Sequence, residues 1–525
     1  MPDTFGSSEV SVAWILGAPV LPSHLRANSA ALLWEGRALT YGQLRERALR
    51  MSAGLREQGL SPGDRVAAYM FNRGEMFELY FACAYAGVSL VPINFRFVAE
   101  ELASVLSDCT PKLLVASPRL LDRVNEAHQY LQGAPRVVVL DEDESGAEYE
   151  SLVAAEPLKG PYHRVDPHLL LYTSGTTGRP KAAMMSHMNI MWAALQSAAF
   201  EPRVDRRVTL LSGPLYNTAA INEMSIPTFL LGGTVGIMPS GNWNAEKMAS
   251  LIDQWSVTHT TVYPSMMEPF LDADSRSPLT LASLRYVLTG GEVCPPDRIR
   301  KFRSRWQHLS VTDGYGMTES SSIASVSDEE FDSHPGAVGR PTGSHTLKVV
   351  NSEGGVAAVG EVGEILSASP AVVSGYWNSS EVSSASLEGG WHRSGDLGWI
   401  DSDGFLHIAG RVKEVVISGA QNVYPAEVER VLRSMPEVGD VAVFGVPDAK
   451  WGESVTAAVE LKAGATLTEA EVVSFAREHL ASYKKPQQVV FVERLPRNAS
   501  QKVEKAVLRE WVLSEEKAPV READT

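Results

Sequence analysis

The chain has 525 residues and a formal net charge of −16, with 44% hydrophobic and 21% charged residues. This length exceeds one compact core, so we expect an ordinary globular protein of at least two domains. The acidic balance argues against a nucleic-acid partner, which would require a basic face. The three cysteines have neither disulfide nor metal-ligand spacing, and no apolar run is long enough to cross a bilayer. We therefore expect a soluble cytoplasmic protein without a transmembrane segment.

The pattern of predicted elements changes twice along the chain. From residue 30 to the stretch LRYVLTGGE, strand-like runs such as RVAAYM alternate with helical runs, and this alternation predicts parallel α/β layers. Thr40 and Gln43 form a capping box before the first long helical run. From about Ala337 to His407, short strands and glycines replace long helices, which is typical of an antiparallel subdomain. Beyond GRVKE, at residues 410–414, a compact α+β pattern follows.

We therefore predict a fold that combines α/β with α+β architecture. Residues 1–410 are expected to form a large N-terminal domain of α/β layers with a β-rich subdomain. The main domain boundary is placed at GRVKE, residues 410–414, where the pattern changes. Residues 415–525 are expected to form a small α+β C-terminal domain.

The stretch YTSGTTGRPK, from Tyr172 to Lys181, carries the clearest chemical signal. It follows the strand-like run LLLY and precedes AAMMSHMNIMWAALQ, which has helical length and apolar spacing. Glycines let backbone N–H groups turn around an anion, hydroxyls add donors, and the lysine adds a mobile positive charge. The Walker pattern does not fit, because Pro180 precedes the lysine and Ala182 follows it. We predict a phosphate-binding loop, with an ordinary Ser/Thr/Gly loop as the alternative. Its expected ligands are Thr173, Ser174, Gly175, Thr176, Thr177, Gly178 and Lys181.

Two further stretches have a composition suited to a nucleotide. In LTGGEVCPP, from Leu288 to Pro296, two glycines permit the backbone to lie close to a flat ring such as adenine, although a plain tight turn has the same composition. In DGYGMTES, from Asp313 to Ser320, carboxylates, a hydroxyl and an aromatic face come together. Mg²⁺ prefers such hard oxygen ligands, so this stretch favours a magnesium nucleotide.

With three later stretches, these motifs resemble the adenylate-forming superfamily of acyl-CoA synthetases, peptide-synthetase adenylation domains and luciferases. The six motifs occur in the order of the family and span nearly the whole chain. They are YTSGTTGRPK, LTGGEVCPP, DGYGMTES, WHRSGDLG from Trp391, GRVKEVVISGAQN from Gly410 and LPRNASQKVEK from Leu495.

The resemblance implies that the chain binds ATP and Mg²⁺, and it gives each motif a role. Tyr315 would pack against adenine, Thr318 would contact phosphate and Glu319 would hold the metal. Asp396 would accept both ribose hydroxyls, as a carboxylate can, and Arg411 would contact the ribose. The remaining residues expected to bind ATP are Gly291, Glu292, Asp313 and Gly316.

The resemblance also implies a reaction in two steps. A carboxylate attacks the α-phosphate of ATP to give an acyl-adenylate and pyrophosphate, and the thiol of coenzyme A then displaces AMP. Lys502 matches the lysine that neutralises charge developing in the first step. The resemblance also implies that residues 411–414 form a hinge and that the C-terminal domain, residues 415–525, is mobile. This domain would then rotate about Lys413, which brings Gly419 and Ala420 to the coenzyme A channel. The expected catalytic residues are Lys502, Lys181, Thr318 and Glu319.

The acid that is activated is predicted from residues beside the motifs. The acyl pocket is expected to contain Tyr216, Asn217, Gly291 and Met317. None of these is charged, which favours an apolar acid, aromatic or medium-chain. The expected partners are therefore a small carboxylic acid, ATP and coenzyme A, and the resemblance leaves a homodimer open.

Three positions depart from the family pattern. Asn217 stands where histidine is usual, Ala420 where glycine is frequent, and Gln501 where glycine usually precedes the lysine. Because the first two lie near the thiol channel, a carrier-protein thiol or an amine is an alternative acceptor, and some relatives activate other oxyacids such as nitrite. A non-catalytic binding protein of this fold would be expected to lack Lys502, Glu319 or Asp396, and all three are present.

Overall fold

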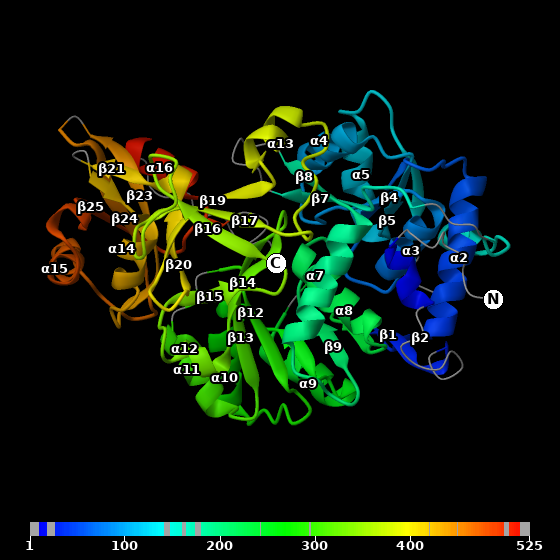
Figure 1. Ribbon diagram of the computed structural model, residues 1–525, viewed down its shortest axis with the longest axis horizontal. Helices are drawn as coiled ribbons and strands as arrows, with labels where there is room; N and C mark the ends of the chain where they lie inside the picture. The colour runs from blue at the N-terminus through cyan, green and yellow to red at the C-terminus, as the bar shows by residue number, and fades with distance from the viewer. Residues whose placement is uncertain are drawn as a thin grey trace. The chain divides into compact units, whose positions relative to one another are not determined.

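The computed structural model describes residues 10–17, 27–140, 147–159, 164–173, 180–241, 243–292, 294, 296–418, 421–448, 450–497 and 503–514. The chain divides into two compact units (Figure 1), the first made of Met1–Leu347 and Ser367–His392, the second of Lys348–Leu366 and Arg393–Thr525. Among the described residues, no helix combines the length and apolarity that a membrane crossing needs. The hinge expected at residues 411–414 lies within the second unit, and its action as a pivot stays a prediction.

The first unit contains a six-stranded sheet in the order β6–β5–β3–β4–β7–β8. All neighbours in it are parallel except β7 and β8. Its strands are β3 (Arg65–Tyr69), β4 (Ser89–Pro92), β5 (Leu113–Ala116), β6 (Arg136–Val139), β7 (Leu169–Thr173) and β8 (Lys181–Met185). Strands β4 and β5 are buried at every position, as expected for a parallel sheet covered on both faces. The predicted α/β layers are confirmed.

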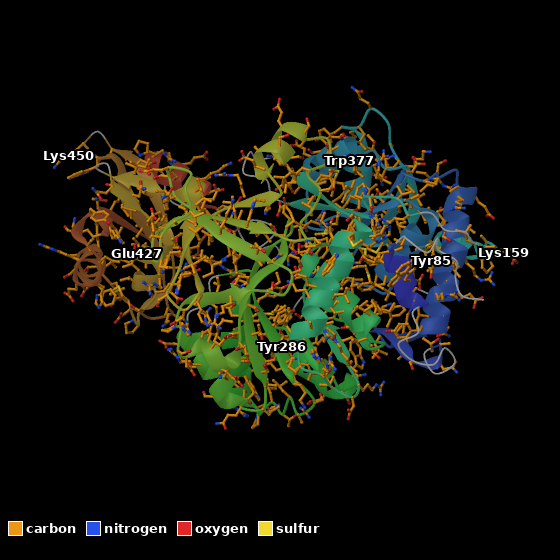
Figure 2. All side chains as sticks on the ribbon, viewed as in Figure 1. Tyr85, Lys159, Tyr286, Trp377, Glu427 and Lys450 are labelled. Atoms are coloured by element: carbon orange, nitrogen blue, oxygen red, sulfur yellow. The ribbon has the colours of Figure 1, made fainter. Side chains whose placement is uncertain are left out.

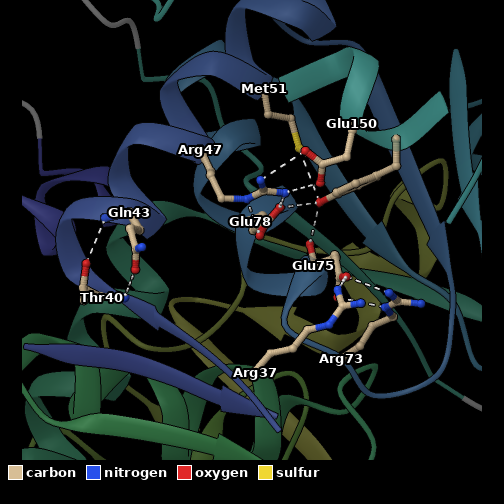
Figure 3. Close-up of polar contacts among 10 residues, drawn as sticks. Arg37, Thr40, Gln43, Arg47, Met51, Arg73, Glu75, Glu78 and Glu150 are labelled. Atoms are coloured by element: carbon tan, nitrogen blue, oxygen red, sulfur yellow. Dashed lines mark hydrogen bonds and ion pairs between the residues drawn. The ribbon is translucent and has the colours of Figure 1, made fainter. Parts of the chain in front are cut away.

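Helices between these strands are tied together by polar contacts as well as apolar packing. They are α2 (Tyr41–Glu57), α3 (Glu75–Ala86), α4 (Ala99–Cys109), η2 (Pro118–Leu120), α5 (Leu121–His128) and α6 (Ala147–Val153). Figure 3 shows Arg47 of α2 donating to Glu78 of α3 at 2.8 Å and to Glu150 of α6 at 2.6 Å. It also shows the predicted capping box of Thr40 and Gln43, which is confirmed at the start of α2.

The helix expected over AAMMSHMNIMWAALQ is present, but its predicted start at Ala182 is wrong. Instead, the chain forms β8, whose antiparallel pairing with β7 places Lys181 opposite Thr173. The helix α7 (His187–Phe200) begins only after the capping residue Ser186. A short apolar run fits either structure, and here pairing with β7 supplies partners for the backbone of residues that the pattern alone assigns to a helix.

A second sheet of the first unit runs β2–β1–β10–β9–β11–β12–β13–β14–β15. Pairing is parallel from β1 through β13 and antiparallel beyond each end of that stretch. Its strands are β1 (Ala30–Trp34), β2 (Arg37–Thr40), β9 (Val208–Leu211), β10 (Thr234–Ile237), β11 (His259–Thr261), β12 (Tyr286–Gly290), β13 (Ser310–Met317), β14 (Ser321–Val326) and β15 (Ala337–Pro341). Tyr286, labelled in Figure 2, begins β12 and is buried.

Further helices and a short strand complete the first unit. They are η1 (Val12–Leu16), the π-helix η3 (Ala219–Met224), α8 (Ser225–Leu230), α9 (Ala245–Trp255), α10 (Pro264–Arg276), α11 (Pro296–Arg305), α12 (Asp328–Phe331), α13 (Ser380–Ser386) and β18 (Leu387–Glu388). The π-helix follows the PLYN turn, residues 214–217. An irregular helix therefore lies next to Tyr216 and Asn217, which are expected in the acyl pocket.

The second unit combines a sheet segment, in which β19 and β20 pair antiparallel, with an α+β lobe. The segment runs β16 (Thr346–Val350), β17 (Gly363–Ala368), β19 (Trp391–Ile400) and β20 (Leu406–Arg411). After η4 (Val412–Glu414), a five-stranded sheet contains β21 (Val416–Ser418), β22 (Gln421–Val423), β23 (Val438–Asp448), β24 (Gly452–Leu461) and β25 (Gln488–Val492). The lobe's helices are α14 (Pro425–Leu432), α15 (Glu469–His479), η5 (Ser482–Lys484) and α16 (Lys505–Ser514). The α+β fold expected for the C-terminal part is confirmed.

Candidate active site

In the first unit, the carboxylate of Glu319 lies beside Thr173, at the start of the predicted phosphate loop. Thr173, the last residue of β7, donates its hydroxyl to Glu319 Oε1 at 3.4 Å. The same threonine pairs with Lys181, the first residue of β8. The structure therefore brings together three expected site residues from two distant stretches of sequence. The catalytic assignment of each residue remains a prediction.

A fourth residue, Tyr376, completes this arrangement and was not found from the sequence. Its hydroxyl donates to Glu319 Oε1 at 2.8 Å, and burial together with Glu319 raises the pKa of Tyr376. The tyrosine is positioned by a bridge to Ala183 of β8 and by the backbone of Trp377, which donates to Ala182 at 2.9 Å. Trp377 is labelled in Figure 2. Only the tertiary structure assigns Tyr376 to the site, because no motif of the predicted site includes this residue.

The carboxylate of Glu319 is suited to a magnesium ion. Both of its hydrogen-bond donors are neutral hydroxyls at Oε1, and within the described ranges no cation pairs with it. Among the described residues, no cluster of three or more His, Cys, Asp and Glu side chains forms a metal cage. Mg²⁺ typically takes one or two carboxylates and completes its shell with water and substrate phosphates. The residues present therefore fit that type of ion.

The two stretches expected around adenine are adjacent strands. Gly290 at the end of β12 lies opposite Gly314 in β13, and a Cβ on Gly290 would be 2.2 Å from the Gly314 carbonyl oxygen. With φ at +143°, Gly290 also has a backbone conformation that only glycine adopts readily. Burial raises the pKa of neighbouring Asp313 to about 7. The remaining expected contacts lie around this strand pair: Gly291, Glu292 and Gly316 are exposed, whereas Tyr315, Met317 and Thr318 are half-buried.

The expected acyl-pocket residues Tyr216 and Asn217 occupy a turn after β9. Tyr216 is buried, and its ring lies edge-on to Phe95 with centroids 5.5 Å apart. The side chain of Asn72 holds the turn, since it accepts from Leu215 N at 3.0 Å and donates to the Gly213 carbonyl. Asn217 itself is exposed. An aromatic wall is thus present at the predicted pocket.

In the second unit, the residues expected to contact ribose are paired. Asp396 of β19 and Arg411 of β20 are register partners, and Arg411 Nε lies 3.2 Å from Asp396 Oδ1. Asp396 is buried whereas the Arg411 side chain is half exposed. The guanidinium offsets the cost of burying the carboxylate, which keeps Asp396 a hydrogen-bond acceptor. Lys413 follows in η4.

Several predicted residues lie outside the described residues. They are Ser174, Gly175, Thr176, Thr177, Gly178, Gly419, Ala420, Gln501 and Lys502. An antiparallel bridge joins Arg497 to Val503, the described residues that flank the predicted catalytic lysine.

Two known protein families match parts of this chain. Residues 23–377 match the AMP-binding enzyme family, and residues 427–502 match the AMP-binding enzyme C-terminal domain. The chain belongs to the AMP-binding enzyme family. This membership confirms the adenylate-forming resemblance drawn from the six motifs.

Individual members of the AMP-binding enzyme family match over almost their full length. The chain is 35% identical to a feruloyl-CoA synthase of Amycolatopsis sp. over 94% of its own length and 97% of that protein. It is 33% identical to an indoleacetate–CoA ligase of Aromatoleum aromaticum, with 93% and 96% covered. The crystal structure of ATP-bound MatB from Rhodopseudomonas palustris superposes with a TM-score of 0.87 at 32% identity, covering 95% of this chain and 98% of that one.

Proposed function

We propose that this AMP-binding enzyme is an acid–CoA ligase. It activates a carboxylic acid with ATP as an acyl-adenylate, releases pyrophosphate, and transfers the acyl group to the thiol of coenzyme A. The observation that carries the proposal is the contact of Glu319 with Thr173, the strand partner of Lys181, where a metal-binding carboxylate and a phosphate-binding loop would share one ATP. Full-length similarity to proteins named as CoA ligases supports the second step.

Each residue of the site has a defined task in the first step. Glu319 would hold Mg²⁺, which when bound neutralises charge on the phosphates. Tyr376 and Thr173 hold that carboxylate in place through their hydroxyls. Lys181 and Thr318 would bind phosphate oxygens, and positioning with charge neutralisation supplies most of the catalysis in phosphoryl transfer.

The second unit contributes to the same reaction in this proposal. Asp396 would accept the ribose hydroxyls while Arg411 balances its charge. Lys502 would neutralise the α-phosphate during adenylation and withdraw when the C-terminal lobe rotates about Lys413. Gly419 and Ala420 would then border the path of coenzyme A.

For the acid, we infer an apolar, aromatic body. This inference rests on the edge-on packing of Tyr216 against Phe95. Aromatic rings favour such arrangements with one another, so this pair would also suit an aromatic acid. The names of the two relatives above both refer to aromatic acids, which supports the same inference.

The test is pyrophosphate release by the purified enzyme with ATP, Mg²⁺ and a panel of aromatic and aliphatic acids. Mass spectrometry should detect an acyl-CoA only when coenzyme A is added. The Glu319→Gln variant is the matched control, and it should lose adenylation without loss of folding. Failure to release pyrophosphate with any acid would rule out the proposed activity.

A further inference from the structure

The acyl side of the site contains a carboxylate that the proposed reaction does not use. Glu223 belongs to the π-helix η3, which follows the turn of Tyr216 and Asn217. Turns of π-helix are rare and occur frequently at functional sites. Such a turn also changes which side chains of a helix face a given wall, so Glu223 cannot be placed from ordinary helical spacing.

Glu223 contacts the residue that directly follows the motif carrying Glu319. The Ser321 hydroxyl donates to Glu223 Oε1 at 3.0 Å. Ser321 lies directly after the DGYGMTES stretch, has a φ of +59°, and pairs with Met317 in the β13–β14 hairpin. Glu223 is therefore joined through one hydrogen bond to β14, at the residue that pairs with the expected acyl-pocket residue Met317 of β13.

Tyr263 is a second polar group near Glu223. Burial raises the pKa of Tyr263, and the nearby groups Glu223, Glu292 and Tyr216 raise it further. The Tyr263 hydroxyl also reaches the PLYN turn, because a Cβ on Gly213 would be only 2.5 Å from it. Glu223 is thus near the same tyrosine as Tyr216, the aromatic wall of the expected pocket.

Among the described residues, the Glu223 carboxyl has no ion pair to offset the cost of its burial. Glu223 is half-buried, yet its surroundings raise the pKa of the carboxyl to about 7. Within the described part of the chain no cation pairs with it, and only Oε1 has a hydrogen-bond partner. Removing a carboxyl oxygen from water raises the free energy of the folded protein unless a hydrogen-bond donor replaces the water. Ionisable groups with strongly shifted pKa values are concentrated at functional sites.

We propose that Glu223 is a specificity-determining residue whose free oxygen accepts a hydrogen bond from a hydroxyl or N–H group on the body of the acid. The aromatic part of that acid would lie against Tyr216, and the donor would reach past Ser321 to Glu223. The substrate class is therefore an aromatic acid that bears a hydrogen-bond donor. This inference rests on the proposed ligase function and narrows it.

The experiment compares acids that match in shape and differ only in the donor. One pair is 4-hydroxycinnamate with 4-methylcinnamate, and the other is indole-3-acetate with benzofuran-3-acetate. In the wild-type enzyme, kcat/KM for pyrophosphate release should favour the donor-bearing acid of at least one pair by about tenfold or more, as expected for a hydrogen bond to a charged or strongly polar acceptor.

Variants of Glu223 should change this preference and leave ATP use intact. Glu223→Leu should abolish or reverse it, mainly through KM for the donor-bearing acid, while KM for ATP stays unchanged. Glu223→Gln keeps an acceptor oxygen and should retain part of the preference. The exposed residue Glu246 provides the control, since Glu246→Gln should preserve the wild-type ratio.

The outcomes separate this inference from the ligase function. Pyrophosphate release with no preference above about twofold in either pair overturns the role of Glu223 alone. So does an equal loss on all acids in Glu223→Leu. No release with any acid overturns the ligase function and this inference with it. If Glu223→Leu does not fold, the wild-type ratio and the Glu223→Gln ratio decide the question.

Discussion

The Tyr376 hydroxyl donates to Oε1 of Glu319 over 2.8 Å. This contact joins a tyrosine beside strand β8 to the carboxylate expected to hold the metal. Tyr376 and Thr173 at the end of β7 therefore meet the DGYGMTES motif at one oxygen atom, Glu319 Oε1. The residue that orients the carboxylate is as much a part of the site as the carboxylate itself.

Replacement of Tyr376 by phenylalanine should weaken metal use without removing the metal ligand. Loss of the shorter of the two hydroxyl contacts leaves Glu319 less well oriented, so kcat/KM for pyrophosphate release should fall about tenfold at limiting Mg²⁺. Excess Mg²⁺ should restore part of the activity, as measured by a magnesium titration. Tyr130→Phe, at an exposed tyrosine, is the control and should behave as wild type. An unchanged magnesium dependence in Tyr376→Phe would contradict the positioning role.

Replacement of Lys502 by alanine should separate the two steps. Adenylate formation should drop by more than about 100-fold, because the cation that neutralises developing charge is gone. Thioester formation from a supplied acyl-adenylate should stay largely intact, since the lysine is expected to withdraw before that step. Both rates are measured on the same preparation, with the exposed Lys301→Ala as the control. Equal losses in the two steps would argue against the assigned role.

Replacement of Gly290 by alanine should destabilise the strand pair that carries the expected adenine contacts. The added Cβ would be 2.2 Å from the Gly314 carbonyl oxygen at a φ of +143°. We expect the free energy of unfolding to fall by about 3 kcal/mol, as measured by urea denaturation. Gly133→Ala is the matched control, because a Cβ there meets nothing within 4 Å and φ is not positive. A stability equal to that of this control would show that β12 and β13 do not approach as described.

Replacement of Glu223 by glutamine should alter the pH dependence of stability. Burial raises the pKa of this carboxyl from 4.5 to about 7, so the folded state binds the proton more tightly than the unfolded state. Wild-type stability from this group is therefore present below pH 4.5 and is lost as the pH rises through 7. The variant does not titrate there, and it should gain about 2 kcal/mol relative to wild type between pH 4.5 and 7.5.

The control variant, Glu246→Gln, should show the opposite change in stability with pH. A hydrogen bond from Arg276 lowers the pKa of the exposed Glu246, so its contribution is present above pH 4.5 and is lost on acidification. Glu246→Gln should therefore lose stability relative to wild type as the pH rises. Denaturant midpoints measured at both pH values test the two variants together. A flat difference for Glu223→Gln would mean that the carboxyl is solvated.

Local chemistry made much of this protein predictable. The capping box of Thr40 and Gln43 and the alternation of helices and strands each depend on neighbouring residues, and the fold bears them out. The expected helix start at Ala182 was wrong for the converse reason: the four-residue apolar run AAMM has no local preference strong enough to resist pairing with β7.

The amino-acid sequence by itself determined the family, the order of the motifs and the kind of chemistry, because those depend on residue types at short spacing. Only the tertiary structure decided that Tyr376 holds Glu319 and that Glu223 lies beside Ser321 and Tyr263. Such pairs are far apart along the chain, and hydrogen bonds between them exist only once packing has brought their strands and helices together. The sequence position of a tyrosine or a glutamate does not indicate which distant residue will become its hydrogen-bond partner.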